Sequence, residues 1–148
     1  MLVKDAMTKH VFTLRADKKA LAAQEIMEWA HVRHVPIVDH LGQLVCMVSR
    51  VGLLKAAMAH ISSRVKVEAE QQLSMIPLDL VWERDIRTIS PDATVRDAAW
   101  MMRAEKLSGL PVVEGKRLVG ILTDYDLLRV LEEPSGVQPF TSGEAARS

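Results

Sequence analysis

Residues 109–128 read GLPVVEGKRLVGILTDYDLL and predict three consecutive elements. Two apolar runs, at 110–113 and 118–122, are separated by a polar turn that contains a glycine, which is typical of two short strands in a hairpin. A Thr-x-x-Asp pattern follows and leads into a run of leucines, as at the start of an amphipathic helix. The segment therefore predicts strand, strand, helix.

The same pattern occurs earlier in the chain. Residues 35–39 (VPIVD) return as 110–114 (LPVVE), 75 positions later, and residues 11–17 (VFTLRAD) return at the same offset as 86–92 (IRTISPD). An offset that stays constant over distant anchors is typical of a duplicated unit. It changes by one residue in the hairpin turn, where length changes are tolerated, so the later pairs lie 74 positions apart: Leu44-Val45 with Leu118-Val119, and Leu53-Leu54 with Leu127-Leu128.

Each unit reads as strand, helix, strand, strand, helix, which places the protein in the α+β class. In the second unit Asp92 is a candidate cap for a helix. The apolar residues Val95, Ala98, Ala99 and Met102 follow it at steps of three and four. This spacing predicts one apolar stripe that faces the sheet.

The segment between the two units has helical spacing. Ala57, Met58, Ile61 and Val65 predict an extended helix and linker through residues 55–73, and the small, polar residues after Glu133 predict a loose tail. The expected organisation is a first repeat at 1–60, a helical linker at 61–76, a second repeat at 77–133 and a C-terminal tail at 134–148.

Composition limits the classes of function. The 148 residues suit one compact domain, or two very small halves that share a core, since halves of this size bury too little surface alone. Nineteen basic and nineteen acidic residues leave no basic field for a nucleic acid. No apolar run approaches the roughly 20 residues of a membrane span. The one cysteine, Cys46, lies in an apolar run, so a reducing compartment, the cytoplasm, is expected.

Apolar residues lie on the flanks of both predicted first helices. A monomer would expose these patches, so they favour a homodimer. The alternative is that the patches meet inside one chain. They comprise Ala22, Ile26 and Trp29 in the first repeat, and Trp100, Met101 and Ala104 in the second.

Motifs for catalysis and metal binding are missing from the sequence. It contains no glycine-rich phosphate loop, no nucleophile elbow and no HExxH pattern, so we expect a protein that is not an enzyme and requires no cofactor. His31 and His34 lie three residues apart, but no further ligand completes a metal set at the usual spacing.

Together these residues resemble a CBS domain, a family named after cystathionine beta-synthase. The resemblance implies a pseudo-twofold pair of repeats, known as a Bateman module, that binds AMP, ADP, ATP or S-adenosylmethionine between its halves. It implies that occupancy is passed to a regulated partner protein, without catalysis. The residues that carry the likeness are 79–80, 84–95, 109–113 and 118–128 in the second repeat, and 3–8, 35–39 and 48–49 in the first.

The resemblance also implies a ligand site. Thr123 and Asp126 would hold ribose hydroxyls, because a carboxylate can accept two hydrogen bonds from a vicinal diol. A helix N-terminus also attracts phosphate. Arg33, His34 and Arg50 are candidates to neutralise that phosphate. The whole predicted set is Thr123 and Asp126 with Ile121 in the second repeat, and Val11, Phe12, Thr13, Arg33, His34, Val35 and Pro36 in the first, where backbone amides would read the adenine.

Two alternatives remain open at this stage. Thr-x-x-Asp at a helix start is also close to a capping box, which needs no ligand. The first repeat departs from the pattern, because Gly52 stands at the position of Asp126 and Cys46 at the position of Gly120. We therefore expect one competent cleft rather than two. The second candidate function is a structural or dimerisation module without a ligand.

Overall fold

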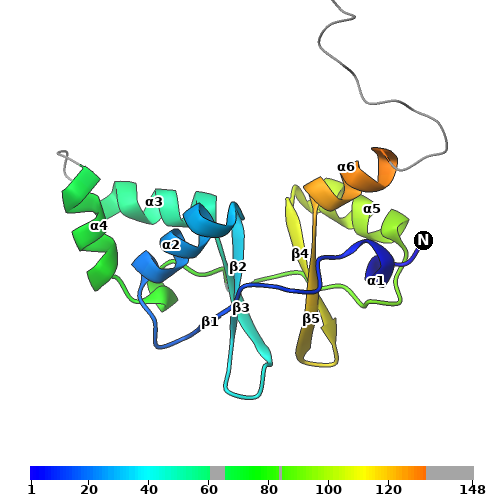
Figure 1. The fold of residues 1–148 in the computed structure, drawn as a ribbon, viewed down its shortest axis with the longest axis horizontal. Helices are drawn as coiled ribbons and strands as arrows, with labels where there is room; N and C mark the ends of the chain where they lie inside the picture. Colours follow the sequence, from blue (N-terminus) through cyan, green and yellow to red (C-terminus); the bar gives the residue numbers. More distant parts are fainter. Residues whose placement is uncertain (61–65, 84, 133–148) are drawn as a thin grey trace, which may run out of the picture.

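The computed structural model describes residues 1–60, 66–83 and 85–132, which form two halves that stand side by side (Figure 1). The first half contains a sheet in the order β1-β2-β3, in which β1 is parallel to β2 and β2 is antiparallel to β3. Its strands are β1 (Leu14–Arg15), β2 (His34–Val38) and β3 (Leu44–Ser49), and its helices are α2 (Ala20–Ala30), α3 (Arg50–His60) and α4 (Lys66–Met75), followed by the 3-10 turn η1 (Leu78–Leu80).

The second half repeats this arrangement around an antiparallel hairpin. A single parallel bridge between Ile89 and Val112 takes the place of β1. The predicted order of strand, helix, strand, strand, helix is thus complete in the first half and has a reduced first strand in the second. The α+β class is confirmed. The elements of this half are α5 (Val95–Glu105), β4 (Gly109–Glu114), β5 (Arg117–Thr123), α6 (Asp124–Glu132) and the short N-terminal helix α1 (Val3–Ala6).

Helix α5 has the predicted apolar stripe but begins with a different cap. Ala98 and Met102 are buried in the second core. The N-cap is Thr94, whose hydroxyl accepts a hydrogen bond from the Asp97 amide, while the Asp97 carboxylate accepts one from the Thr94 amide. This capping box satisfies two free amides at once. The prediction of Asp92 as the cap is wrong, since its carboxylate pairs with Lys4 at 2.8 Å.

Two segments, which we call the N-terminal arm (residues 2–8) and the linker arm (residues 76–83), cross between the halves. Val3 and Ala6 of the N-terminal arm lie in the core of the second half. Its Thr8 pairs with Ile121 of β5, and Glu83 of the linker arm pairs with Met47 of β3 in the same way. Each core therefore includes residues that are distant in sequence.

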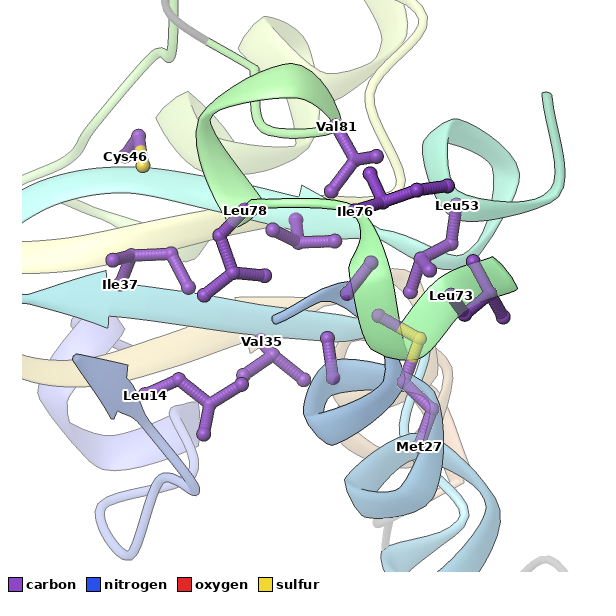
Figure 2. Packing of buried hydrophobic residues seen from close by; sticks show 13 residues of the cluster. Leu14, Met27, Val35, Ile37, Cys46, Leu53, Leu73, Ile76, Leu78 and Val81 are labelled. Carbon is purple, nitrogen blue, oxygen red and sulfur yellow. The ribbon is translucent and has the colours of Figure 1, made fainter. Parts of the chain in front are cut away.

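Figure 2 shows how α4 and the linker arm complete the first core. Leu73, Ile76, Leu78 and Val81 come from this part of the chain and are buried against β2 and α2. The extended helix expected through 55–73 differs from the structure, in which α3 ends at His60 and α4 begins at Lys66. The predicted tail at 134–148 lies outside the described residues, as do Glu133 and positions 61–65.

The two halves contact each other through backbone and side chains. The hairpin tips pair, with the Leu44 amide donating to the Lys116 carbonyl at 2.9 Å. Away from the tips, Ser108 Oγ lies 3.0 Å from His34 Nε2. His34 is buried, and this burial lowers the pKa of its imidazole below the ordinary 6.5, with a further lowering from the Arg33 guanidinium.

Leu78 and Leu80 lie in the same turn and offer a matched test of the linker arm. Leu78 is fully buried in the first core and Leu80 is 65% exposed. Leu78→Ala should lower the free energy of unfolding by about 2–5 kcal/mol, because it removes buried methyl groups and leaves a cavity. Leu80→Ala should change it by less than about 0.5 kcal/mol. Urea denaturation measures both, and equal effects would contradict the placement of the arm in the core.

The burial of His34 predicts a pH dependence of stability. The folded state favours neutral imidazole, so the unfolded chain takes up a proton below pH 6.5 that the folded chain resists. The free energy of unfolding should therefore fall as the pH drops from 6.5 through the lowered pKa of His34. His34→Gln should remove this component and exposed His31→Gln should retain it. Parallel pH profiles for wild type and His34→Gln, measured by urea denaturation, would show that His34 does not contribute.

Candidate functional site

Thr123 and Asp126 meet at the start of α6, as the sequence predicts. The Asp126 carboxylate is 4% exposed, and its Oδ2 accepts hydrogen bonds from the Thr123 hydroxyl and the Thr123 amide, both at 2.9 Å. In return, the Asp126 amide donates to the Thr123 hydroxyl at 3.4 Å. The pair thus forms the capping arrangement that the sequence left as an alternative, and Oδ2 is fully engaged by it.

The second oxygen of Asp126 is held less tightly. Thr8 of the N-terminal arm donates to Oδ1 at 3.4 Å, and the Arg129 guanidinium lies 3.5 Å from the same atom. Both distances are at the long end for hydrogen bonds, which are strongest near 2.9 Å. A ligand hydroxyl that reached Oδ1 could therefore replace a weak contact rather than a strong one.

The predicted residues of the first repeat lie in two environments. Arg33 reaches across to the second half, where its Nη2 pairs with Asp124 Oδ1 at 2.6 Å, one residue from Thr123. Val35 and Pro36 are fully buried in β2, so they can offer only backbone atoms to a ligand. Ile121 is buried in β5, and its backbone pairs with Thr8.

Residues 11–13 connect the N-terminal arm to β1 and so run between the halves. Val11 and Thr13 are half-buried, and Phe12 is 44% exposed. The Phe12 ring packs edge-to-face on Trp29 of α2, with the ring centroids 5.4 Å apart. Phe12 is therefore engaged by the first helix of its own repeat.

A cavity of about 480 Å³ opens beside α3, at the position in the first repeat that corresponds to the start of α6 in the second. We call it the first cleft. This volume is within the usual range for small-molecule sites, about 300–1,000 Å³. Arg33 and His34 line it, while Thr123 and Asp126 do not. Its polar walls include Ser49 and Arg50 at the start of α3, Glu83 at the end of the linker arm, Asp85 and Arg87 after it, and Lys106 and Ser108 before β4.

Glu83 is the polar residue that the sequence analysis missed. Ser49 occupies the position of Thr123, and its hydroxyl donates to Glu83 Oε1 at 2.9 Å while accepting from the Gly52 amide at 3.0 Å. A carboxylate thus stands beside the hydroxyl although Gly52 has none. Extending the 75-residue offset would have paired Glu83 with Thr8 and drawn attention to it.

Gly120 leaves room for the N-terminal arm. A Cβ at this position would lie 2.5 Å from Met7 Sδ and 2.9 Å from the Thr8 carbonyl oxygen. The close approach is therefore made by the N-terminal arm. At the equivalent position in β3, Cys46 is buried in the first core.

Two absences within the described ranges bear on other functions. No group of three or more histidine, cysteine, aspartate or glutamate side chains is arranged to hold a metal ion there. In the same residues, no helix is both long enough and apolar enough to cross a bilayer.

Solved structures with this fold are known. A Vibrio cholerae protein named for acetoin utilization (AcuB) is 34% identical, with a TM-score of 0.75, and the match covers 89% of this chain and 92% of that one. The CBS domain pair of protein MJ0100, crystallised with 5′-methylthioadenosine and S-adenosyl-L-methionine, is 28% identical, with a TM-score of 0.75 and coverage of 89% and 96%.

The curated relatives include longer proteins. Homoserine O-acetyltransferase of Methanococcoides burtonii is 31% identical over 130 residues, which is 87% of this chain. The chain spans 24% of the length of that enzyme and 32% of the length of another curated relative. The model of the CBS domain family matches residues 3–59 and 83–133, which include most of both repeats. The chain therefore belongs to the CBS domain family, as a tandem pair.

Proposed function

We propose that this CBS pair is a regulatory module that binds an adenosine-type ligand, of the AMP, ADP, ATP or S-adenosylmethionine class, between its repeats. The observation that carries the proposal is the Thr123–Asp126 pair, which places a hydroxyl and a carboxylate at the start of α6 beside the other repeat. The bound 5′-methylthioadenosine and S-adenosyl-L-methionine of the MJ0100 pair support this ligand class. No catalytic role is proposed.

Binding in the cleft beside α6, the second cleft, would exchange weak protein contacts for ligand contacts. A ribose hydroxyl would take the place of Thr8 at Asp126 Oδ1, where the present contact is 3.4 Å long. A ligand phosphate would compete with Asp124 for the Arg33 guanidinium, which is more than half exposed. The Arg33–Asp124 ion pair joins the two halves, so breaking it would alter how they are held together.

This exchange suggests how occupancy could reach a partner. A ligand shifts a protein between two arrangements only when it binds one of them more tightly. Here the differential contacts would be those of Thr8 and Arg33, one on an arm and one between the halves. We infer that a regulated partner protein responds to this change, and that the module acts in the cytoplasm. The competing function is a structural module that binds no ligand.

Isothermal titration with AMP, ATP and S-adenosylmethionine tests the proposal. Asp126→Asn should weaken binding in the second cleft about 10- to 100-fold, because it removes the charge from a hydrogen-bond acceptor for the ribose. Glu132→Gln, at the exposed end of the same helix, is the matched control and should leave binding unchanged. Wild-type protein that binds none of the three ligands would favour the structural module.

We also propose a homodimer that covers the exposed helix faces. Trp29 and Trp100 lie on equivalent helices and are 74% and 64% exposed. Of the other residues predicted for these patches, Ala104 is exposed. Ala22 and Ile26 pack partly on the first core and Met101 on the second. The two tryptophans therefore supply most of the uncovered apolar area.

Sedimentation equilibrium tests the dimer. The wild type should sediment as a dimer, and Trp29→Ser/Trp100→Ser should shift it to monomer, because the loss of two aromatic side chains removes apolar contact area. Replacement of exposed Lys18 and Arg96 by Ser in a control protein should leave the dimer intact. A monomeric wild type at high concentration would contradict the proposal.

A further inference from the structure

We propose that Arg129 is a positioning residue for the second cleft, because its guanidinium ties the N-terminal arm to the ribose acceptor Asp126. The inference rests on the proposed function for its ligand class and deepens it in one respect. It identifies the N-terminal arm as the segment through which occupancy of the second cleft is passed on.

The Arg129 guanidinium stands between the arm and the acceptor. Its Nη2 donates to the carbonyl oxygen of Ala6, the last residue of α1, at 2.9 Å, and lies 3.5 Å from Asp126 Oδ1. The last carbonyl groups of a helix have no partner within that helix, so a side chain can satisfy them. The same nitrogen therefore contacts the backbone of the arm and the atom that would accept the ribose hydroxyl.

Asp126 needs a cation because its carboxylate is buried. Its side chain is 5% exposed, and a carboxylate withdrawn from water is costly unless charges or donors replace the solvent. Among the residues that the structure describes, Arg129 is the one basic side chain that forms an ion pair with it. Arg129 is itself half exposed, so solvent screens part of the attraction. The guanidinium thus balances the charge and directs Oδ1 toward the arm.

Thr8 makes a second connection between the arm and the same oxygen. Its hydroxyl donates to Asp126 Oδ1 at 3.4 Å, and its backbone pairs in both directions with Ile121, at 2.9 and 3.0 Å. The backbone pairing holds the arm on β5, whereas both side-chain contacts to Oδ1 are long. A ligand hydroxyl at Oδ1 would therefore change the side-chain contacts of the arm and leave its strand pairing in place.

The first repeat supplies an internal comparison, because it lacks both members of the pair. Lys55 stands at the position of Arg129, and Gly52 at that of Asp126, each 74 residues earlier. Lys55 is exposed and forms no ion pair with the residues that the structure describes. The Val81 carbonyl of the linker arm lies only 3.4 Å from where a Cβ at Gly52 would be. The arginine and the carboxylate are thus present together in one repeat and absent together from the other.

Sharing one guanidinium links the arm to the affinity for ligand. A shift of Ala6 would move Arg129, and Asp126 would then lose the cation that balances it. By reciprocity, a ligand that changes the contacts of Asp126 changes how firmly the arm is held. The arm is therefore a segment on which a regulated partner can sense, or set, the occupancy of the second cleft.

Titration of AMP and 2′-deoxy-AMP tests the role of Arg129. The proteins are wild type, Arg129→Gln, Arg129→Lys and, as the matched control in the other repeat, Lys55→Gln. Arg129→Gln should weaken AMP binding about 3- to 10-fold and reduce the preference for AMP over 2′-deoxy-AMP, because Asp126 loses its balancing charge and its orientation. One nitrogen makes both contacts, so the point charge of Arg129→Lys should keep affinity within about twofold of wild type. Lys55→Gln should bind as wild type does.

Amide hydrogen exchange of the N-terminal arm gives a readout that needs no ligand. The Met7 amide donates to the Val3 carbonyl and the Thr8 amide to the Ile121 carbonyl, so both are protected. Arg129→Gln should speed their exchange about 3- to 10-fold, because the arm loses its bond at Ala6. Arg129→Lys and Lys55→Gln should retain the wild-type rates. AMP should change the rates in wild type and not in Arg129→Gln.

The outcomes distinguish the inference from the proposed function. If Arg129→Gln binds both nucleotides as wild type does, or loses affinity for both equally, the inference is overturned and the proposed function stands. Unchanged exchange of the arm in Arg129→Gln overturns the inference likewise. A wild-type protein that binds no nucleotide contradicts the proposed function and the inference with it. Thermal melts check that all four proteins fold, as expected for changes at exposed side chains.

Discussion

The fold depends on the exchange of arms between the two halves. Thr8 pairs with Ile121 and Glu83 with Met47, so each arm adds to the last strand of a repeat while the chain passes on to the other half. The arms also bring apolar residues into each core, Val3 and Ala6 into the second and the residues around Leu78 into the first. A half of this size buries too little surface on its own. The exchange therefore links the two repeats, because each core is completed by one of the arms.

The same exchange forms the first cleft and brings Thr8 to the Thr123–Asp126 pair beside α6. Each arm runs past the start of a repeat's last helix, so the walls of a cleft come from segments far apart in sequence. The N-terminal arm lies so close to β5 at Gly120 that any side chain there would collide with Met7 and the Thr8 carbonyl. The clefts thus follow from the way in which the strands are completed, and the functional groups of the arms are placed by backbone pairing.

The sequence predicted what depends on local pattern. The hairpin at 109–123 and its copy, the stripe of α5 and the Thr123–Asp126 pair all follow from spacing within one repeat, and the structure contains them. The cap of α5 was predicted at Asp92 and lies two residues later, at Thr94. The arms left no such pattern, because their contacts join residues about 35 to 120 positions apart, a separation over which periodicity carries no information.

Glu83 shows why aligned repeats can mislead about a site. Comparing like positions led from Asp126 to Gly52 and to the expectation of a missing carboxylate. A cleft, however, is built from a helix start and an arm, so the correct comparison is between pairs, Thr8 with Asp126 and Glu83 with Gly52. The two pairs differ in which member carries the carboxylate, and also in how rigidly that carboxylate is held.

Asp126 is buried and hydrogen-bonded to the turn that it caps, and so it is held in one position. The Glu83 side chain is longer and exposed, and it accepts one side-chain hydrogen bond, from Ser49, in the part of the chain that the structure describes. The start of α3 is capped by the Ser49 hydroxyl instead. Ordering a glutamate side chain costs conformational entropy that a fixed aspartate has already lost on folding. The duplicated architecture therefore places one carboxylate that is held in a fixed position beside α6 and one less constrained carboxylate beside α3.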